Sequence, residues 1–242
     1  MRITLKRQDQ WAVVECINYV EHPEAYCGLD LPFFLWGRSA GAYLCLLAAA
    51  RRSSHRARGI LSYYGYGFLC DNWFQTPSDY YRSLPAVDAS CLDHAGTDLH
   101  AQGALDTHYS VYVYARQTGS WRSLLYEGRE KYFYLDYTLR ACPSLPCPLF
   151  CAHSTNDPDV PYAEFLELSS RYQPRQFIAP GNVHDFDRTK RTPLQKNYFW
   201  SPWSFFNLTR NNLTRNIFEK CHVLLLHNWC SITIQLVCQN KI

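Results

Sequence analysis

Two hydrophobic runs of different character meet at a short segment that contains a serine between two glycines. Residues 31–36 (LPFFLW) form a continuous apolar run, which is typical of a strand buried on both faces of a parallel sheet. Residues 42–52 (AYLCLLAAARR) are rich in helix formers and end in cations, which suits the carboxyl end of a helix. The segment between them, residues 37–41 (GRSAG), predicts a very tight turn from strand to helix.

Such a turn exposes the serine hydroxyl to a neighbouring base. Gly37 and Gly41 leave room for the backbone on either side of Ser39, and the helix amino terminus favours negative charge beside it. The amide of Ala40 is the expected oxyanion donor. A bare Gly-x-Ser-x-Gly arises easily by chance, so an ordinary strand–turn–helix is the alternative. The strand and helix patterns on both sides favour a nucleophile elbow.

Short apolar runs and helical patterns alternate on both sides of a long middle segment. The expected helices are residues 11–24, 42–52 and 162–172, and the expected strands are residues 31–36, 59–66, 148–152 and 175–179. This alternation indicates the α/β class, with a mostly parallel sheet covered by helices.

The middle segment, residues about 68–142, is predicted to be an irregular insertion that caps the sheet. It is crowded with Tyr and Trp, in a chain whose aromatic content is 16%. These side chains either line a pocket for acyl chains or aromatic alcohols, or pack the insertion's own core. They are Trp73, Tyr80, Tyr81, Tyr109, Tyr112, Tyr114, Trp121, Tyr126, Tyr132, Tyr134 and Tyr137.

Residues 148–161 (PLFCAHSTNDPDVP) resemble the H-G-x-x-D-x-x-V-P segment of esterases and prolyl-oligopeptidase-like hydrolases. The resemblance places Asp157 at the position of the catalytic acid, with Ser154 where that family usually has glycine. Asp159 is the alternative acid, because both aspartates belong to one loop. Either of them is otherwise an ordinary solvated turn residue.

Residues 181–187 (GNVHDFD) follow the last expected strand and are similar to the loop that carries the family's histidine. His184 is therefore the predicted base, which takes the proton of Ser39 while Asp157 orients the ring. A lone histidine is more often structural, and His22 and His153, which lie off the motif, are interpreted in that way.

These motifs together resemble the α/β-hydrolase superfamily, in its esterase/lipase or prolyl-oligopeptidase-like (peptidase S9-like) branches. The resemblance covers roughly residues 10–187 and implies a serine hydrolase that cleaves a small carboxylic ester through an acyl-enzyme. It implies no cofactor. A serine peptidase-like activity is the alternative within the same chemistry.

The sequence departs from the family before the nucleophile. Relatives carry several strands there, and a loop among them, often His-Gly-Gly-Gly, supplies the second oxyanion donor. Here Ser39 comes early and no His-Gly-Gly occurs, so we expect an N-terminally truncated domain over residues 1–187, with its early strands missing and one sheet edge unpaired. Loss of one donor typically lowers the rate about 100- to 1000-fold. An inactive relative that keeps the triad is therefore the second functional hypothesis.

Residues 188–242 differ sharply in composition from the rest. They hold eight of the 24 Lys and Arg, one of the 21 acidic residues (Glu219), and no Gly, Ala or Asp. We interpret them as an atypical basic tail, either disordered or foreign to the fold, such as a frameshifted end. A partner-binding extension is the rival interpretation, and binding of nucleic acid, supported only by the tail's charge, is a weaker third.

Bulk composition narrows the remaining choices. A net charge of +3 indicates no nucleic-acid or membrane partner, and no uninterrupted apolar stretch is long enough to span a bilayer. The 11 cysteines and the polar amino terminus favour reduced thiols in the cytoplasm. Cys142, Cys147 and Cys151 lack zinc-ligand spacing, so no metal site is expected. The oligomeric state is not predicted.

Overall fold

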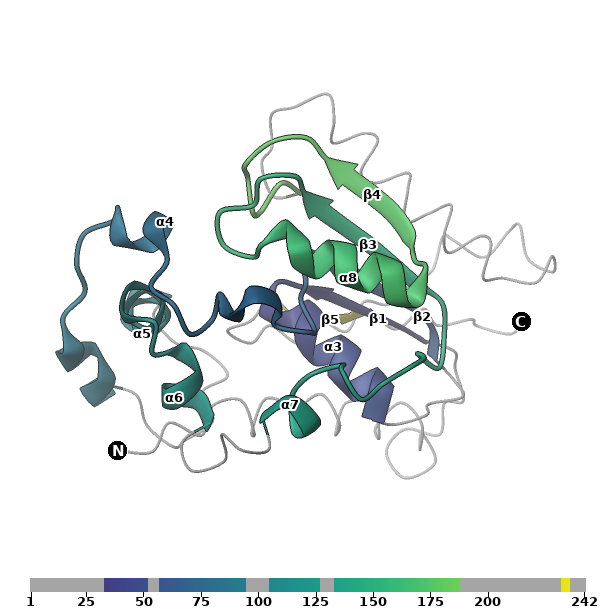
Figure 1. The fold of residues 1–242 in the computed structure, drawn as a ribbon, viewed down its shortest axis with the longest axis horizontal. Helices are drawn as coiled ribbons and strands as arrows, with labels where there is room; N and C mark the ends of the chain where they lie inside the picture. Colours follow the sequence, from purple (N-terminus) through teal and green to yellow (C-terminus); the bar gives the residue numbers. More distant parts are fainter. Residues whose placement is uncertain (1–32, 52–56, 95–104, 127–132, 188–231, 236–242) are drawn as a thin grey trace, which may run out of the picture.

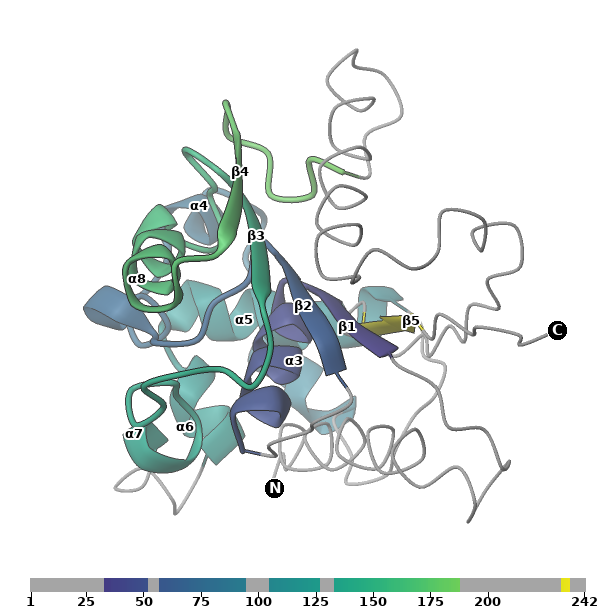
Figure 2. The same cartoon turned by 90° about the vertical axis from the view of Figure 1, so that its right-hand side faces the viewer.

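The computed structural model describes residues 33–51, 57–94, 105–126, 133–187 and 232–235. Five strands form one sheet in the order β4-β3-β2-β1-β5 (Figures 1 and 2). Four of them are parallel, and β5 pairs antiparallel with β1. Their bounds are β1 Phe33–Arg38, β2 Ala57–Tyr63, β3 Leu149–Ser154, β4 Arg175–Ala179 and β5 Ile232–Gln235.

Two helices cover one face of this sheet. They are α3, Ala40–Arg51, which follows β1, and α8, Tyr162–Tyr172, which joins β3 to β4 (Figure 2). Each connects one parallel strand to the next, so each must cross a face of the sheet. The expected mostly parallel α/β sheet is thereby confirmed.

The inner strands β1, β2 and β3 are largely apolar because both faces of the sheet are buried along them. Leu35 and Ile60 point into the core beneath α3 and α8, whereas their neighbours Phe34 and Leu61 point to the opposite face. There they join an aromatic cluster that includes Phe186, from the segment after β4. Alternating side chains thus feed two cores, as the uninterrupted hydrophobic runs predicted.

The middle of the chain is more regular than its sequence suggested. Its described parts form short helices and one long helix, α5, in place of the irregular structure that we expected. Several of these helices bury an aromatic side chain, namely Tyr81, Trp121 and Phe133, and such tertiary packing stabilises short helices more than intrinsic propensity does. The elements are η1 Cys70–Asn72, α4 Asp79–Arg82, η2 Ala89–His94, α5 Leu105–Thr118, α6 Trp121–Tyr126 and α7 Phe133–Asp136.

Helices α4, α5 and α6 lie beyond the carboxyl ends of the parallel strands (Figure 1). Many of the insertion's aromatic rings pack internally: Trp73 stacks on Trp121, and Phe74 stacks on Phe133. Others remain exposed, including Tyr109 and Tyr134. Four of the predicted aromatic residues, Trp73, Tyr81, Trp121 and Tyr137, therefore pack a core, whereas a role in lining a pocket stays a prediction.

A buried carboxylate fastens the start of the insertion to the sheet domain. Glu164 of α8 is fully buried and accepts four hydrogen bonds, from the amides of Gly67, Phe68 and Cys70 and from the indole of Trp73, at 2.6–3.0 Å. A buried charge is tolerated only with such complete pairing. The segment leading into η1 is therefore held on α8.

The ends of the chain fall largely outside the described residues. The expected helix at residues 11–24 and His22 lie there, as does all of the tail except β5. Those four tail residues occupy the edge beside β1, which we had expected to be unpaired. The division at residue 187 stays a prediction.

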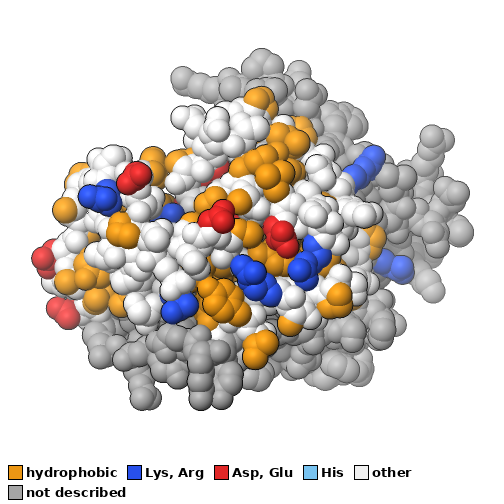
Figure 3. Space-filling view, in the orientation of Figure 1, with side chains coloured by type: hydrophobic (Ala, Val, Ile, Leu, Met, Phe, Trp, Pro, Cys, Tyr) orange, Lys and Arg blue, Asp and Glu red, His pale blue; other side chains and the backbone are white. Residues whose placement is uncertain are grey.

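Two further observations concern the surface and the helices of the described residues. On the face shown in Figure 3, acidic, basic and apolar side chains are interspersed among the coloured atoms. No helix in the described ranges combines the length and apolar character needed to cross a membrane.

Candidate active site

The turn between β1 and α3 has the geometry of a nucleophile elbow. Ser39 has a φ of 51°, a left-handed conformation that is strained for a residue with a side chain. Its amide donates to the Tyr63 carbonyl at 2.9 Å, and its own carbonyl accepts from Ala42 at 3.0 Å as the helix begins. A Cβ on Gly37 would lie 2.3 Å from the Gly41 carbonyl oxygen, so only glycine permits this close passage of strand and helix.

The structure brings the three predicted side chains into one hydrogen-bonded chain. His184 Nε2 lies 3.0 Å from Ser39 Oγ, and its Nδ1 lies 2.7 Å from Asp157 Oδ2. With the imidazole neutral, the serine hydroxyl donates to Nε2 and Nδ1–H donates to the carboxylate. Ser39 precedes His184 by 145 residues, and the two meet because β1, β3 and β4 are parallel and end at the same edge of the sheet.

Asp157 is fixed by its own loop. Its side chain is fully buried, and Oδ1 accepts from the amides of Asp159 and Val160 at 2.9 and 3.0 Å, which leaves Oδ2 for His184. His153 lies beneath this loop and bonds the Val160 carbonyl through Nε2 at 3.0 Å. Burial lowers the pKa of His153 despite the nearby charge of Asp157, so its ring is neutral at ordinary pH. Its position fits the structural role expected of it.

Asp159 lies on the other side of the imidazole. Its Oδ2 is 3.5 Å from His184 Nε2, the nitrogen that also faces Ser39. Its Oδ1 accepts from the Tyr112 hydroxyl at 2.7 Å, and its backbone carbonyl accepts from Arg116 at 3.2 Å. The two aspartates of the loop thus contact opposite nitrogens of one ring, and it is Asp157 that occupies the Nδ1 side.

The electrostatic surroundings favour a protonated His184. Burial disfavours the charge, but the hydrogen bond that His184 donates to Asp157 and the negative charges of Asp159, Asp157 and Asp185 outweigh it and raise the pKa of His184 above its ordinary value. The imidazolium that forms during proton transfer is therefore stabilised in this site.

A second network, which sequence reasoning missed, joins the elbow to the histidine loop. Asp187 accepts from Arg38 Nε at 2.6 Å and from the Tyr64 hydroxyl at 2.8 Å. Arg38 immediately precedes the nucleophile, and the Tyr64 ring packs on His184 with centroids 4.5 Å apart. Burial first, then the charge of Asp187, raise the pKa of Tyr64, so its hydroxyl remains a donor. The sequence feature that could have indicated this network was Arg38, a charged residue inside the Gly-x-Ser-x-Gly motif.

The remaining predicted positions are only partly placed. Ala40 is the first residue of α3, so its amide points from the helix amino terminus beside Ser39. No second oxyanion donor is assigned among the described residues. Within the same ranges no group of three or more His, Cys, Asp or Glu side chains is arranged to hold a metal ion. Cys151 lies on β3, whereas Cys147 precedes that strand.

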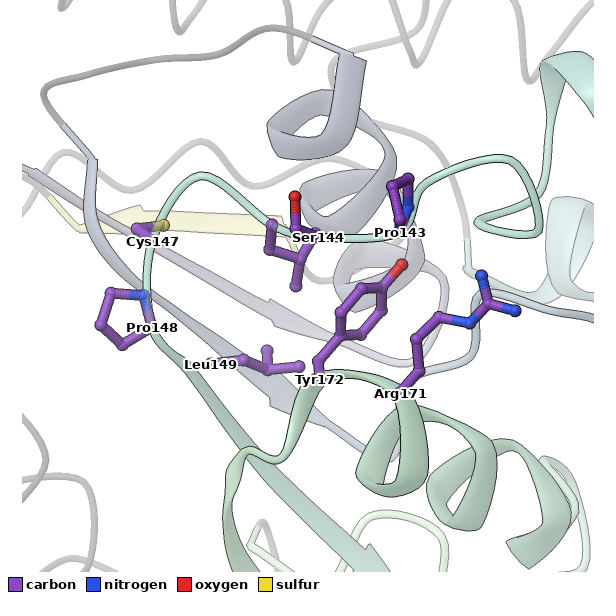
Figure 4. A pocket seen from close by; sticks show the side chains of 8 residues that line it. Pro143, Ser144, Cys147, Pro148, Leu149, Arg171 and Tyr172 are labelled. Carbon is purple, nitrogen blue, oxygen red and sulfur yellow. The ribbon is translucent and has the colours of Figure 1, made fainter.

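A cavity of about 220 Å³ lies away from this site (Figure 4). It opens near the amino end of β3, whereas Ser39 and Asp157 follow the carboxyl ends of their strands. Its lining comes from the segment before β3 and the end of α8: Pro143, Ser144, Leu145, Cys147, Pro148, Leu149, Arg171 and Tyr172.

Comparison with known proteins identifies the fold. No protein-family model and no curated protein matches the sequence. Among solved structures, a protein of unknown function from Staphylococcus aureus subsp. aureus Mu50 is 27% identical, with a TM-score of 0.65 over 83% of this chain and 71% of that one. An α/β-hydrolase superfamily protein from Enterococcus faecalis is 18% identical, with a TM-score of 0.65 over 82% and 72%. This chain therefore has the α/β-hydrolase fold, as its motifs predicted.

Proposed function

We propose that this protein is a serine hydrolase that cleaves a small carboxylic ester through an acyl-enzyme. The observation that carries the proposal is the continuous hydrogen-bonded chain from Ser39 through His184 to Asp157. The strained conformation of Ser39 and the two loop amides that hold Oδ1 of Asp157 support it further. This arrangement positions a nucleophile, a base and an orienting acid before any substrate arrives.

In the first half of the proposed reaction Ser39 Oγ attacks the ester carbonyl carbon as its proton moves to His184 Nε2. The carboxylate of Asp157 stabilises the imidazolium, and the amide of Ala40 donates to the developing oxyanion. When the carbonyl re-forms, the bond to the alcohol oxygen breaks, and Nε2–H delivers its proton to that oxygen. An alcohol leaves and an ester on Ser39 remains.

In the second half water replaces the alcohol. His184 takes a proton from water, the resulting oxygen nucleophile attacks the acyl carbon, and the proton returns to Ser39 Oγ as the acid departs. The reaction consumes one water and requires no cofactor. We place it in the cytoplasm, and the cysteines within the described ranges are all free thiols, which fits a reducing compartment.

A fluorophosphonate probe tests the proposal directly, because it labels only an activated serine. The probe should label the full-length wild-type chain and not Ser39→Ala, and wild type should hydrolyse p-nitrophenyl esters of short acids with a burst of nitrophenol. Circular dichroism of both proteins provides the folding control. Folded wild-type protein that is neither labelled nor active would favour the inactive relative instead.

A further inference from the structure

The side of His184 that faces Ser39 carries a second carboxylate. Asp159 Oδ2 lies 3.5 Å from Nε2, and Ser39 Oγ lies 3.0 Å from the same nitrogen. In the proposed reaction Nε2–H protonates the departing alcohol, so the alcohol oxygen must lie beside Nε2. Asp159 therefore borders the position of the leaving group, on the opposite side of the ring from Asp157.

The charge of Asp159 is held in place but only partly compensated. Tyr112 donates to Oδ1 at 2.7 Å, while Oδ2 faces His184. Arg116 donates to the backbone carbonyl of Asp159, and its guanidinium carbon lies 4.6 Å from the centroid of the Trp73 ring. Within the described part of the chain, no Lys or Arg lies within ion-pair distance of the Asp159 carboxylate. Only 9% of the side chain is exposed, so solvent screens this charge weakly.

A cluster of tyrosines adjoins the same carboxylate through the Tyr112 hydroxyl. Tyr112 packs against Tyr81 and Tyr109, with ring centroids 5.6 and 6.2 Å apart. Tyr109 is 48% exposed, so this cluster extends from Asp159 to the surface. Burial first, and the charge of Asp159 in the same direction, raise the pKa of Tyr112, so its hydroxyl stays a donor. Aromatic rings beside a carboxylate attract cations. The Arg116 guanidinium already lies over the Tyr81 and Tyr112 rings, at 5.4 and 6.0 Å, so the half-exposed Tyr109 ring is the one that a substrate cation would meet.

Other acidic side chains add to this negative charge, and the Arg116 guanidinium on the Asp159 carbonyl offsets part of it. Asp157 and Asp185 add to Asp159 around His184. Arg38 is paired with Asp187 and lies over the Trp36 ring. A leaving group that carries a positive charge would therefore be attracted at this position, and one that carries a carboxylate or phosphate would be repelled.

We propose that Asp159 determines leaving-group specificity, and that the site favours esters whose alcohol carries a quaternary or protonated amine. The proposal rests on the proposed esterase function and names the substrate class for it. The products are a carboxylic acid and a cationic amino alcohol. Tyr112 acts as a positioning residue, because its hydroxyl holds Asp159 toward Nε2.

Two esters of the same shape test this proposal. The alcohol of 2-(trimethylammonio)ethyl butanoate has a quaternary nitrogen where 3,3-dimethylbutyl butanoate has a carbon atom. Wild-type enzyme should show a kcat/KM at least about tenfold higher for the cationic ester. Asp159→Asn should bring this ratio close to one, while Asp93→Asn, an exposed change in the same insertion, should keep it. Because both rates come from one enzyme, a general loss of activity cancels.

Inhibition of the wild-type enzyme gives a readout that needs no variant to fold. Choline should inhibit hydrolysis of the neutral ester more strongly than 3,3-dimethylbutanol, its uncharged analogue. Suppose that Ser39 is labelled by the fluorophosphonate probe, but the two esters have equal kcat/KM, or choline and 3,3-dimethylbutanol inhibit equally. Either result would overturn the cation preference and leave the proposed hydrolase activity standing. A cationic preference that persists in folded Asp159→Asn would overturn the role of Asp159. Absence of both labelling and hydrolysis would overturn the hydrolase itself.

Discussion

The two sides of His184 are built in different ways. On the Nδ1 side, Asp157 is fixed by amides two and three residues further along its own loop. On the Nε2 side, Ser39 comes from the elbow, Asp159 from the acid loop and Tyr112 from the insertion. The local side fixes the orientation of the base. The Nε2 side, where residues from three distant segments meet, faces the substrate. Changes in those segments should therefore alter this side most.

The largest expected effect on catalysis comes from the Nδ1 side, where Asp157 lies. Asp157→Asn should lower kcat about 10⁴-fold, because an amide presents a donor to Nδ1 and favours the wrong tautomer. Single-turnover hydrolysis of a p-nitrophenyl ester measures it. Asp159→Asn is the matched control from the same loop, and its loss should be far smaller. Equal losses in the two variants would contradict our assignment of the acid.

The turn that places Ser39 on the Nε2 side depends on the close passage of backbone at Gly37. Gly37→Ala should destabilise the fold by about 4 kcal/mol or more, because the new methyl group overlaps backbone atoms of Gly41 and Ala42 that cannot rotate away. Urea unfolding measures the change. Gly181→Ala is informative beside it: no atom lies near its Cβ, but its φ of 129° strains alanine. A smaller loss at Gly37 than at Gly181 would argue against the tight passage.

Glu164, the buried carboxylate that fastens the start of the insertion to α8, should contribute to the stability of the fold. Glu164→Gln should cost about 2–3 kcal/mol, because the new amide group faces N–H donors and leaves them unpaired. Thermal unfolding provides the measurement. Glu167→Gln, on the same helix with a partly exposed ion pair to Arg171, should change stability little. Similar losses of stability in the two variants would mean that the Glu164 carboxylate does not hold the insertion on α8.

The network between the elbow and the histidine loop should have a moderate effect on rate. Asp187→Asn removes the charge that holds Arg38 and should lower kcat about tenfold, by loosening the registry of Ser39 and His184. Tyr64→Phe, which removes one hydrogen bond and keeps the ring on His184, should cost less. Steady-state kinetics on one neutral ester compares them. A reversed order would assign the positioning to the Tyr64 hydroxyl.

The smallest effect is a shift in pH dependence. Catalysis needs neutral His184, so kcat/KM rises with pH as the imidazolium loses its proton. Because the pKa of His184 is raised, this rise should occur above the pH expected for an ordinary histidine. Asp159→Asn removes one of the negative charges that raise the pKa of His184, so the rise should move to lower pH.

A pH–rate profile for the neutral ester, compared with Asp93→Asn, measures this shift. The other titratable groups around His184 are Asp157, Asp185, His153 and Tyr64, and they remain unchanged in both variants. A rise that stays in place or moves to higher pH would show that Asp159 does not act on the base.

Much of the candidate site could be predicted because its parts are encoded locally. The glycine pair around Ser39 and the acid loop of Asp157 are short motifs whose shape depends on neighbours in sequence. The helix Tyr162–Tyr172 and the strand Arg175–Ala179 were predicted with the observed bounds. The helices of the insertion were not, because their formation depends on burying aromatic residues against partners far away in the chain.

The sequence by itself determined the fold class through its hydrophobic periods, which act over a few residues. Its resemblance to short α/β-hydrolase motifs indicated the three candidate catalytic side chains. Only the tertiary structure decided which ring nitrogen each aspartate contacts, because Asp157 and Asp159 differ by two positions and point to opposite sides of His184. It also joined Arg38, Tyr64 and Asp187 into one network. Contacts between residues more than a hundred positions apart follow from the order of strands in the sheet, which no local pattern records.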